Sequence, residues 1–239
     1  MEQYHFAMVI GATGGIGYRV ACELANRVKK IYLFATTVEK LAVLENDLHQ
    51  INNRLSIHAE PLNFADDDLN LKLKIEALNL ENSVGVLANC AGTYLSRTFA
   101  GTTEDCIHKH FSINAMGPMQ IVAHTIDYLQ PGSLIINIGS SLSYQPKSNR
   151  VLASAVKHAV RGFSLSLAEE LAESGIRVCL LNPRSVATPL LQKNSSSAAY
   201  QQAMPVEDLV NAISMILNCD RKTLFSEINV GASQGFLGK

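Results

Sequence analysis

Three glycines in "VIGATGGIG", namely Gly11, Gly15 and Gly17, have the residue type and the spacing to bind a phosphate group. They follow a short apolar run and open a stretch of helical periodicity, which is a strand–turn–helix setting. Glycine lets the backbone adopt conformations closed to other residues and lets a ligand approach closely. The N–H groups and positive dipole end of the following helix favour a pyrophosphate. A tight structural turn would not need three glycines, so the pattern predicts dinucleotide binding.

The elements that must position this loop alternate along the chain. Short apolar runs predict strands, and apolar residues at helical spacing predict helices. The expected strands are 6–10, 30–35, 54–59, 84–89, 133–139, 176–182 and 225–230, and the expected helices are 15–28, 38–51, 66–78, 104–129, 150–173 and 205–217. Such alternation predicts a doubly wound α/β fold, a parallel sheet of about seven strands with helices on both faces.

Gly117 and Pro118 interrupt the fourth expected helix. With no linker or repeat in view, residues 1–239 are expected to form one domain. The polar, serine-rich segment 190–205 is typical of a flexible connection, and we expect residues 190–204 to act as a lid over the substrate.

Composition limits the range of functions. The chain has 239 residues, 47% of them hydrophobic and 17% charged, which is typical of a globular protein. The net charge of −1 gives no reason to expect a nucleic acid or membrane partner. The five cysteines are scattered, which suits a reducing compartment, and we expect a cytoplasmic protein without signal peptide or membrane span. His108 and His110 lie two residues apart and are expected at the surface, so no metal site is predicted.

Five further motifs follow the glycine loop in a fixed order. They are "ANCAG" (88–92), "SINAMGP" (112–118), "IINIGSS" (135–141), "AVK" (155–157) and "LLNPRSVATPL" (180–190). Taken together, they resemble the short-chain dehydrogenase/reductase family, and the resemblance covers nearly the whole chain. That family has N-x-A-G after its fourth strand, a helix asparagine, a catalytic serine, Y-x-x-x-K and P-G-x-x-x-T. The resemblance implies a single-domain Rossmann fold and an NAD(P)-dependent oxidoreductase.

The resemblance also implies the roles of individual residues. Ser140 matches the serine that holds the substrate oxygen, Asn114 the asparagine that supports a water chain, and Lys157 the lysine that contacts the cofactor ribose and lowers the pKa of the tyrosine. The implied cofactor-binding residues are Gly11, Thr13, Gly15, Ile16, Gly17, Thr36, Asn63, Asn89, Ala91, Gly92, Lys157, Pro183, Val186 and Thr188.

Three positions depart from the family pattern. Ile10 stands where the glycine motif usually begins with threonine, and Asn63 stands at the place of an aspartate that contacts adenine. Arg184 replaces the glycine after Pro183, where it would reach a cofactor phosphate, a substrate carboxylate or solvent. The second strand ends in "LFATTVEK", without the acid that binds a ribose 2′-hydroxyl, which favours NADP over NAD.

The largest departure is at residue 153. The family's tyrosine would lie four residues before Lys157, on the same face of the helix, and this sequence has Ala153 there. The tyrosine donates or takes the substrate proton while a hydride moves to or from the nicotinamide. The general acid–base group is therefore missing from a site that otherwise keeps Asn114, Ser140 and Lys157.

Three interpretations of Ala153 remain open. In the first, the redox chemistry persists, with Tyr144 or a water in place of the tyrosine. In the second, the chain binds NADP without redox activity, as a sensor, a scaffold subunit, or a non-redox enzyme such as a cyclase or dehydratase that uses Ser140. In the third, Ala153 is an engineered substitution of tyrosine in an active reductase.

The substrate site and the assembly are predicted more coarsely. We expect a pocket for a small or medium carbonyl or alcohol compound, lined by the 190–204 segment and by Thr93, Tyr94, Leu142, Tyr144 and Arg184, with Lys193 as a second cation. Apolar residues expected at the surface of two long helices, including Val160, Phe163 and Leu167, favour a homodimer or homotetramer of the kind this family forms.

Overall fold

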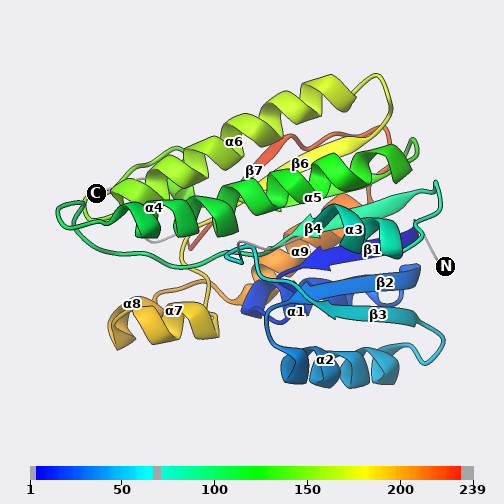
Figure 1. Ribbon diagram of the computed structural model, residues 1–239, viewed down its shortest axis with the longest axis horizontal. Coiled ribbons are helices and arrows are strands. Elements are labelled where there is room, and N and C mark those ends of the chain that lie inside the picture. Colours follow the sequence, from blue (N-terminus) through cyan, green and yellow to red (C-terminus); the bar gives the residue numbers. More distant parts are fainter. Residues whose placement is uncertain (1–3, 67–70, 233–239) are drawn as a thin grey trace.

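One parallel sheet of seven strands forms the centre of the molecule (Figure 1). The computed structural model describes residues 4–66 and 71–232. The strands are β1 (Tyr4–Ile10), β2 (Val28–Ala35), β3 (Ser56–Pro61), β4 (Gly85–Asn89), β5 (Leu134–Ile138), β6 (Arg177–Pro183) and β7 (Glu227–Val230). Their order is β3-β2-β1-β4-β5-β6-β7, so the direction of winding reverses between β1 and β4. The predicted doubly wound α/β fold is confirmed.

Helices cover both faces of this sheet (Figure 1). The helices are α1 (Gly15–Leu24), α2 (Val38–Ile51), α3 (Leu71–Ala77), α4 (Glu104–Phe111), α5 (Gly117–Thr125), α6 (Val151–Leu171), α7 (Pro189–Asn194), α8 (Ser197–Gln201) and α9 (Val206–Asn218). A hydrophobic core lies on each face of the sheet, and successive side chains of β1 point into one core and then the other. Ala7 and Val9 pack with α1, α2 and α9, while Phe6, Met8 and Ile10 pack with α3, α5 and α6. Each strand of the centre is thus buried on both sides, as parallel strands usually are.

The expected long helix 104–129 is interrupted, but one turn earlier than Gly117. Residues Ser112–Met116 form a π-helical turn between α4 and α5. Pro118 has no backbone N–H to donate to the carbonyl of Asn114, four residues earlier, so a regular α-helical ladder cannot continue through this point. The helix therefore changes its hydrogen-bonding pattern around Asn114.

The segment 190–205, predicted to be a flexible connection, contains most of α7 and all of α8. One expectation about the surface of α6 was wrong. Val160 and Leu167 are only 3% and 8% exposed and belong to the core, and Phe163 is half-buried, since this face of α6 packs on the sheet. The start of the expected helix 66–78 falls on residues 67–70, outside the described residues. No helix among the described residues is long and apolar enough to cross a membrane.

Candidate active site

A cavity of about 270 Å³ opens where β4, β5 and β6 end. The segments that follow these strands form much of its wall, and α6 closes another side. The carboxyl ends beside the reversal of winding are where open α/β sheets bind ligands. The lining residues are Ile16, Cys90, Ala91, Gly92, Thr93, Tyr94, Leu95, His110, Asn114, Ile138, Gly139, Ser140, Ser141, Leu142, Lys147, Arg150, Ala153, Val156, Lys157, Pro183, Arg184, Ser185, Val186, Thr188, Leu190 and Leu191.

The glycine loop lies between β1 and α1, and each glycine is packed too closely for a side chain. Gly11 has a φ of +76°, and a Cβ there would lie 2.7 Å from the backbone of Ala91. A Cβ on Gly15 would lie 2.8 Å from the side chain of Thr188, and one on Gly17 would lie 2.2 Å from the carbonyl oxygen of Gly11. The loop is therefore held against the ends of β4 and β6.

The start of α1 is open to an anion. Its N-cap is Gly14, no side chain caps the first turn, and that turn contains no acidic residue. Backbone N–H groups at such a helix start have no intrahelical acceptor, and the positive end of the helix dipole lies there as well. The loop thus offers donors and a favourable field without using a charged side chain.

A row of buried asparagines crosses the sheet next to the cavity. Asn89 at the end of β4 donates its Nδ2–H to Oδ1 of Asn137 at 2.8 Å, and Asn137 donates to the hydroxyl of Ser164 on α6 at 2.9 Å. Oδ1 of Asn89 is buried without a hydrogen-bond partner. An unpartnered buried oxygen costs stability unless a ligand or water donates to it, so Asn89 has unused capacity for a donor.

Asn114 sits on the π-helical turn, with its side chain held from several sides. Its Oδ1 accepts from the backbone N–H of Thr93 at 2.8 Å, and its Nδ2 donates to Oγ1 of Thr93 and to the carbonyl of His110, both at 2.9 Å. The expectation that His110 lies at the surface was wrong: it is buried, and its Nδ1 lies 3.0 Å from Oγ1 of Thr93. The surface prediction is right only for His108, which is exposed.

Ser140 directly follows β5, and its backbone is fixed by a neighbouring strand. Its N–H donates to Oδ1 of Asn182 at 3.1 Å, and its Oγ accepts from the N–H of Leu142 at 3.2 Å. Because Oγ already accepts one hydrogen bond, the hydroxyl proton remains available to a ligand in the cavity. The serine is therefore placed to donate to an oxygen bound there.

A chain of polar contacts stands behind this serine. Asn182 donates its Nδ2–H to Oε1 of Glu227 at 2.7 Å. Arg161 of α6 donates two hydrogen bonds to the same carboxylate, at 2.8 Å to Oε1 and 2.9 Å to Oε2. The hydrogen bond from Arg161 is the main reason why the pKa of Glu227 lies below its usual value. These contacts connect the surface of α6 to the backbone of Ser140, and nothing in the sequence motifs predicted them.

Lys157 extends from α6 into the cavity, one turn after Ala153. Its Nζ donates to the carbonyl of Ile138 at 2.9 Å, at the end of β5. Burial of the ammonium group lowers its pKa to about 8, partly offset by Cys90. Ala153 is 9% exposed and lines the same cavity. The methyl group there leaves a space beside Lys157 with no proton donor of its own.

The structure brings together most, but not all, of the residues that the sequence nominated. Ser140, Lys157, Ala153 and Asn114 line the cavity, as do Ile16, Ala91, Gly92, Thr93, Tyr94, Leu142, Pro183, Arg184, Val186 and Thr188. The residues outside the lining are Gly11, Thr13, Gly15, Gly17, Thr36, Asn63, Asn89, Tyr144 and Lys193. Asn63 is engaged locally, because its Nδ2 donates to Asp66 at 2.6 Å and its Oδ1 accepts from Ala65 at 3.1 Å.

Two cations in the lining were missed. Arg150 comes directly before α6, and Lys147 lies three residues earlier. Arg150 donates to the hydroxyl of Tyr94 and, at 3.1 Å, to the carbonyl of Leu95. Its guanidinium lies 4.4 Å from the centre of the Tyr94 ring. No family motif covers these positions, and only the meeting of the β4 and β5 loops in space reveals them.

Comparison with known proteins defines the class. The profile of the short chain dehydrogenase family matches residues 5–199, so the chain belongs to that family of oxidoreductases. An uncharacterized oxidoreductase of Staphylococcus epidermidis is 23% identical over 94% of this chain and 95% of its own length. The L-xylulose reductase of Caenorhabditis elegans is 25% identical over 88% of this chain and 87% of its own length. The family predicted from the six motifs is confirmed.

The fold is shared with solved structures of the same type. A variant of actinorhodin polyketide ketoreductase, crystallised with NADPH, superposes with a TM-score of 0.84. The two chains are 19% identical, and the match covers 99% of each. At this identity the likeness establishes the fold, and the chemistry has to come from the residues of this chain.

Proposed function

We propose that this protein is an NADP(H)-dependent oxidoreductase that interconverts a small carbonyl compound and its alcohol without a catalytic tyrosine. The observation that carries the proposal is the meeting of Ser140, Lys157 and the ends of β4 and β6 around one cavity. Members of this family use such an arrangement to place a carbonyl oxygen beside a nicotinamide. Ala153 stands where the resemblance places the tyrosine.

The residues present fit a dinucleotide. The close packing of Gly11, Gly15 and Gly17 leaves a side-chain-free surface, and the start of α1 supplies donors for a pyrophosphate. The unpartnered oxygen of Asn89 can accept a hydrogen bond from the cofactor. When bound, NADPH would supply the hydride for reduction. A phosphate on its ribose would meet Thr36 and Thr37 after β2 rather than a carboxylate, which favours NADP over NAD.

The side chains would divide the rest of the reaction as follows. The Ser140 hydroxyl donates a hydrogen bond to the carbonyl oxygen and orients it. The Lys157 ammonium stabilises the negative charge that develops on this oxygen. The proton reaches the oxygen from Lys157 through a water beside Ala153, since Tyr144 does not line the cavity. A pKa of about 8 keeps Lys157 mostly protonated at neutral pH while allowing it to release the proton.

The missing tyrosine also favours a second candidate function. A methyl group at residue 153 removes a proton donor but leaves the proposed cofactor surface intact, which is what a protein that binds NADP without redox activity requires. In that case the cavity would hold a ligand for sensing, or for a non-redox reaction at Ser140. Both functions predict cofactor binding, and only the first predicts hydride transfer.

Two measurements test the proposal. Isothermal titration with NADPH and NADH should show binding of both, with NADPH the tighter ligand. Absorbance of NADPH at saturating cofactor, followed across a panel of small aldehydes and ketones, should show slow turnover above the rate of a Ser140→Ala variant. Absence of binding by either cofactor at millimolar concentration contradicts the whole proposal. Binding without turnover of any substrate would favour the non-redox function.

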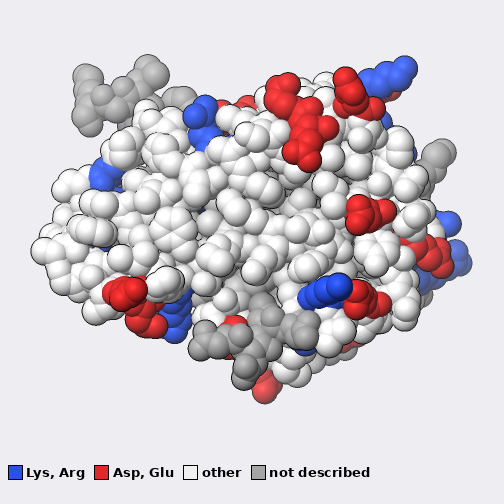
Figure 2. Space-filling model, turned by 45° about the horizontal axis from the view of Figure 1, so that its top comes forward, with Lys and Arg blue, Asp and Glu red and all other residues white. Residues whose placement is uncertain are grey.

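We also propose that the chain forms a homodimer or homotetramer. Figure 2 shows a face whose central area has no charged side chain at the surface, with charges gathered towards its margins. Exposed apolar residues on the chain include Phe99, Met116 and Val151, which are 51%, 48% and 49% exposed. Burial of such residues favours association. Light scattering at micromolar concentration should give at least twice the monomer mass of 26.0 kDa, and a monomer would contradict this expectation.

A further inference from the structure

The charges in the cavity all have one sign. Among the described residues that line it, four are cationic, Lys147, Arg150, Lys157 and Arg184, and none is an aspartate or glutamate. The chain as a whole carries a net charge of −1, so this is a local concentration of positive charge. Like charges gathered in a partly enclosed space repel one another, and a bound anion relieves that repulsion.

Two of these cations belong to the part of the site already described. Lys157 contacts the end of β5 and serves the proposed reaction. Arg184 follows β6, where its Nη1 donates to Gln145 at 3.3 Å and its side chain packs so closely over Gly231 that a Cβ there would lie 2.5 Å from its Cδ. Lys147 and Arg150 remain, and no step of the proposed reaction uses them.

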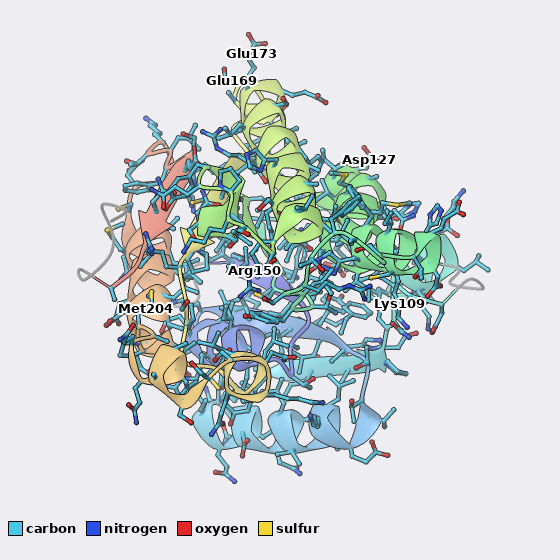
Figure 3. All side chains as sticks on the ribbon, turned by 90° about the vertical axis from the view of Figure 1, so that its left-hand side faces the viewer. Lys109, Asp127, Arg150, Glu169, Glu173 and Met204 are labelled. Atoms are coloured by element: carbon cyan, nitrogen blue, oxygen red, sulfur yellow. The ribbon has the colours of Figure 1, made fainter. Side chains whose placement is uncertain are left out.

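These two cations are also in the wrong place to serve the cofactor phosphates. The proposed pyrophosphate site is the start of α1, and the ribose phosphate would lie after β2. Arg150 instead contacts Tyr94 and Leu95, which follow β4, and β1 separates β2 from β4 in the sheet. Figure 3 shows Arg150 near the centre of this end of the molecule, between α6 and the α7–α8 pair.

Arg150 is held in a position that suits anion binding. Its two contacts with Tyr94 and Leu95 use two of the five N–H donors of a guanidinium, and the Tyr94 ring supports its plane. A guanidinium that is already ordered loses little side-chain entropy when it binds, and its planar fork matches the oxygens of a carboxylate or phosphate. Lys147, which is exposed, adds a second positive charge on the same side.

Resting on the proposed reductase function, we propose that the substrate is a small carbonyl compound bearing a carboxylate or phosphate group. Arg150 and Lys147 bind this oxoanion, while the carbonyl oxygen meets Ser140 in the same cavity. A volume of about 270 Å³ limits the substrate to a compound of modest size. The sequence indicated a moderately apolar pocket with Arg184 and Lys193 as its cations. Arg184 does line the cavity, Lys193 does not, and Lys147 and Arg150 add two cations that the sequence did not indicate.

Matched pairs of ligands test this inference by binding, independently of turnover. The probes are levulinate against methyl levulinate, and dihydroxyacetone phosphate against dihydroxyacetone, titrated calorimetrically with and without saturating NADP⁺. At least one anion should bind ten times more tightly than its neutral partner, and the pair that shows the preference identifies carboxylate or phosphate as the group. If no anion exceeds its neutral partner, the inference is wrong.

Variants test whether Arg150 and Lys147 cause the preference for the anion over its neutral partner. Arg150→Met and Lys147→Met should each reduce this preference several-fold, and Arg150→Lys should keep part of it. Lys109→Met is the control and should leave the preference unchanged. Lys109 is an exposed cation of α4 and lies away from Arg150, to its right in Figure 3. Because Arg150→Met also removes the contact with Tyr94, the Lys147 variant gives an independent result.

The outcomes separate this inference from the proposed function. An anion preference that survives both methionine variants overturns the assignment, even if the enzyme turns over ketones. If NADPH does not bind at all, the proposed function fails, whereas the preference of the cofactor-free protein for an anion can still be measured. Turnover of neutral ketones at the same kcat/KM as their anionic partners would support the function and contradict the inference.

Discussion

The candidate site has two sides that are built in different ways. On the side of β1 and α1, next to the cavity, the surface is backbone: a Cβ added to Gly11, Gly15 or Gly17 would lie only 2.2–2.8 Å from atoms of Ala91, Thr188 or Gly11. On the side of α6, it consists of side chains from separate segments, such as Ser140, Lys157 and Arg150, each oriented by its own hydrogen bonds. A backbone surface fails when any glycine gains a side chain, whereas a side-chain surface can lose one group and keep the others. That difference explains how Ala153 can occur in an otherwise preserved site.

The most direct way to sharpen this comparison is Ala153→Tyr. If the α6 side lacks only one group, the new phenol should lie one helical turn from Lys157, near an oxygen bound by Ser140. The ammonium charge should lower the pKa of the phenol, and general acid catalysis should raise the rate of carbonyl reduction by about 10²-fold or more. NADPH consumption over a carbonyl panel measures the gain, with cofactor affinity as the control. No gain with intact binding would favour the non-redox function.

The backbone side should break with a single methyl group, in Gly17→Ala. The added Cβ would lie 2.2 Å from the carbonyl oxygen of Gly11, so α1 or the loop has to move. If the overpacking cost of about 1–3 kcal/mol falls on the bound state, NADPH binding should weaken by about 5- to 150-fold. Gly162→Ala is the matched control, because a Cβ there meets nothing within 4 Å, and it should leave the affinity unchanged. Equal affinities of the two variants, measured by titration, would contradict the assignment of the loop.

The same division separates what the sequence predicted from what it could not. The alternation of apolar runs and helical patterns predicted seven strands and their parallel arrangement, because the cores on both faces are formed by local periodicity. The glycine loop was predicted for the same reason, since its shape depends on neighbouring residues. Boundaries shifted by a few residues, as at β2, which begins at Val28 rather than residue 30.

The contacts between segments far apart in the chain could not be predicted from the sequence. Arg161 and Glu227 are 66 residues apart, and Arg150 and Tyr94 are 56 apart, so no periodicity connects them. His110 was expected at the surface because it lies two residues from His108 and no metal site was predicted there, but in the fold its Nδ1 lies 3.0 Å from Oγ1 of Thr93, 17 residues earlier. Lys147 and Arg150 were missed for the same reason, because they reach the cavity only through the folding of the loop before α6.

Lys157→Met should separate the function of the α6 side from its stability. Burial lowers the pKa of Lys157 from 10.5 to about 8, so between these values the unfolded chain binds more protons, and stability rises with pH. Below about pH 8 the cost of burying the charge is fully present. Allowing for solvent around the half-buried side chain, the variant should be more stable by about 1–3 kcal/mol at pH 7 and lose this advantage towards pH 10.5. Denaturant unfolding at pH 7 and 10 measures it, and an unchanged difference would contradict the burial argument.

The smallest effect is expected where side chains support the site from behind, in Glu227→Gln. Hydrogen bonding by Arg161 lowers the pKa of Glu227, so its contribution to stability is present above the ordinary value of 4.5 and is lost as the pH falls through the lower value of the folded protein. Removing the charge should cost about 1 kcal/mol at pH 7, because the carboxylate is only 17% exposed and accepts two hydrogen bonds from Arg161, and the cost should shrink as the pH falls below 4.5.

The kcat and the NADPH affinity of Glu227→Gln test whether the two sides of the site act separately. Asn182 loses its ionised acceptor and holds the N–H of Ser140 less firmly, so kcat should fall a few-fold while NADPH affinity stays the same. Glu173→Gln is the control, since Glu173 is exposed just beyond the far end of α6 in Figure 3 and should change neither quantity. A loss of NADPH affinity as large as the loss of kcat would mean that the two sides of the site are not separable in the way their construction implies.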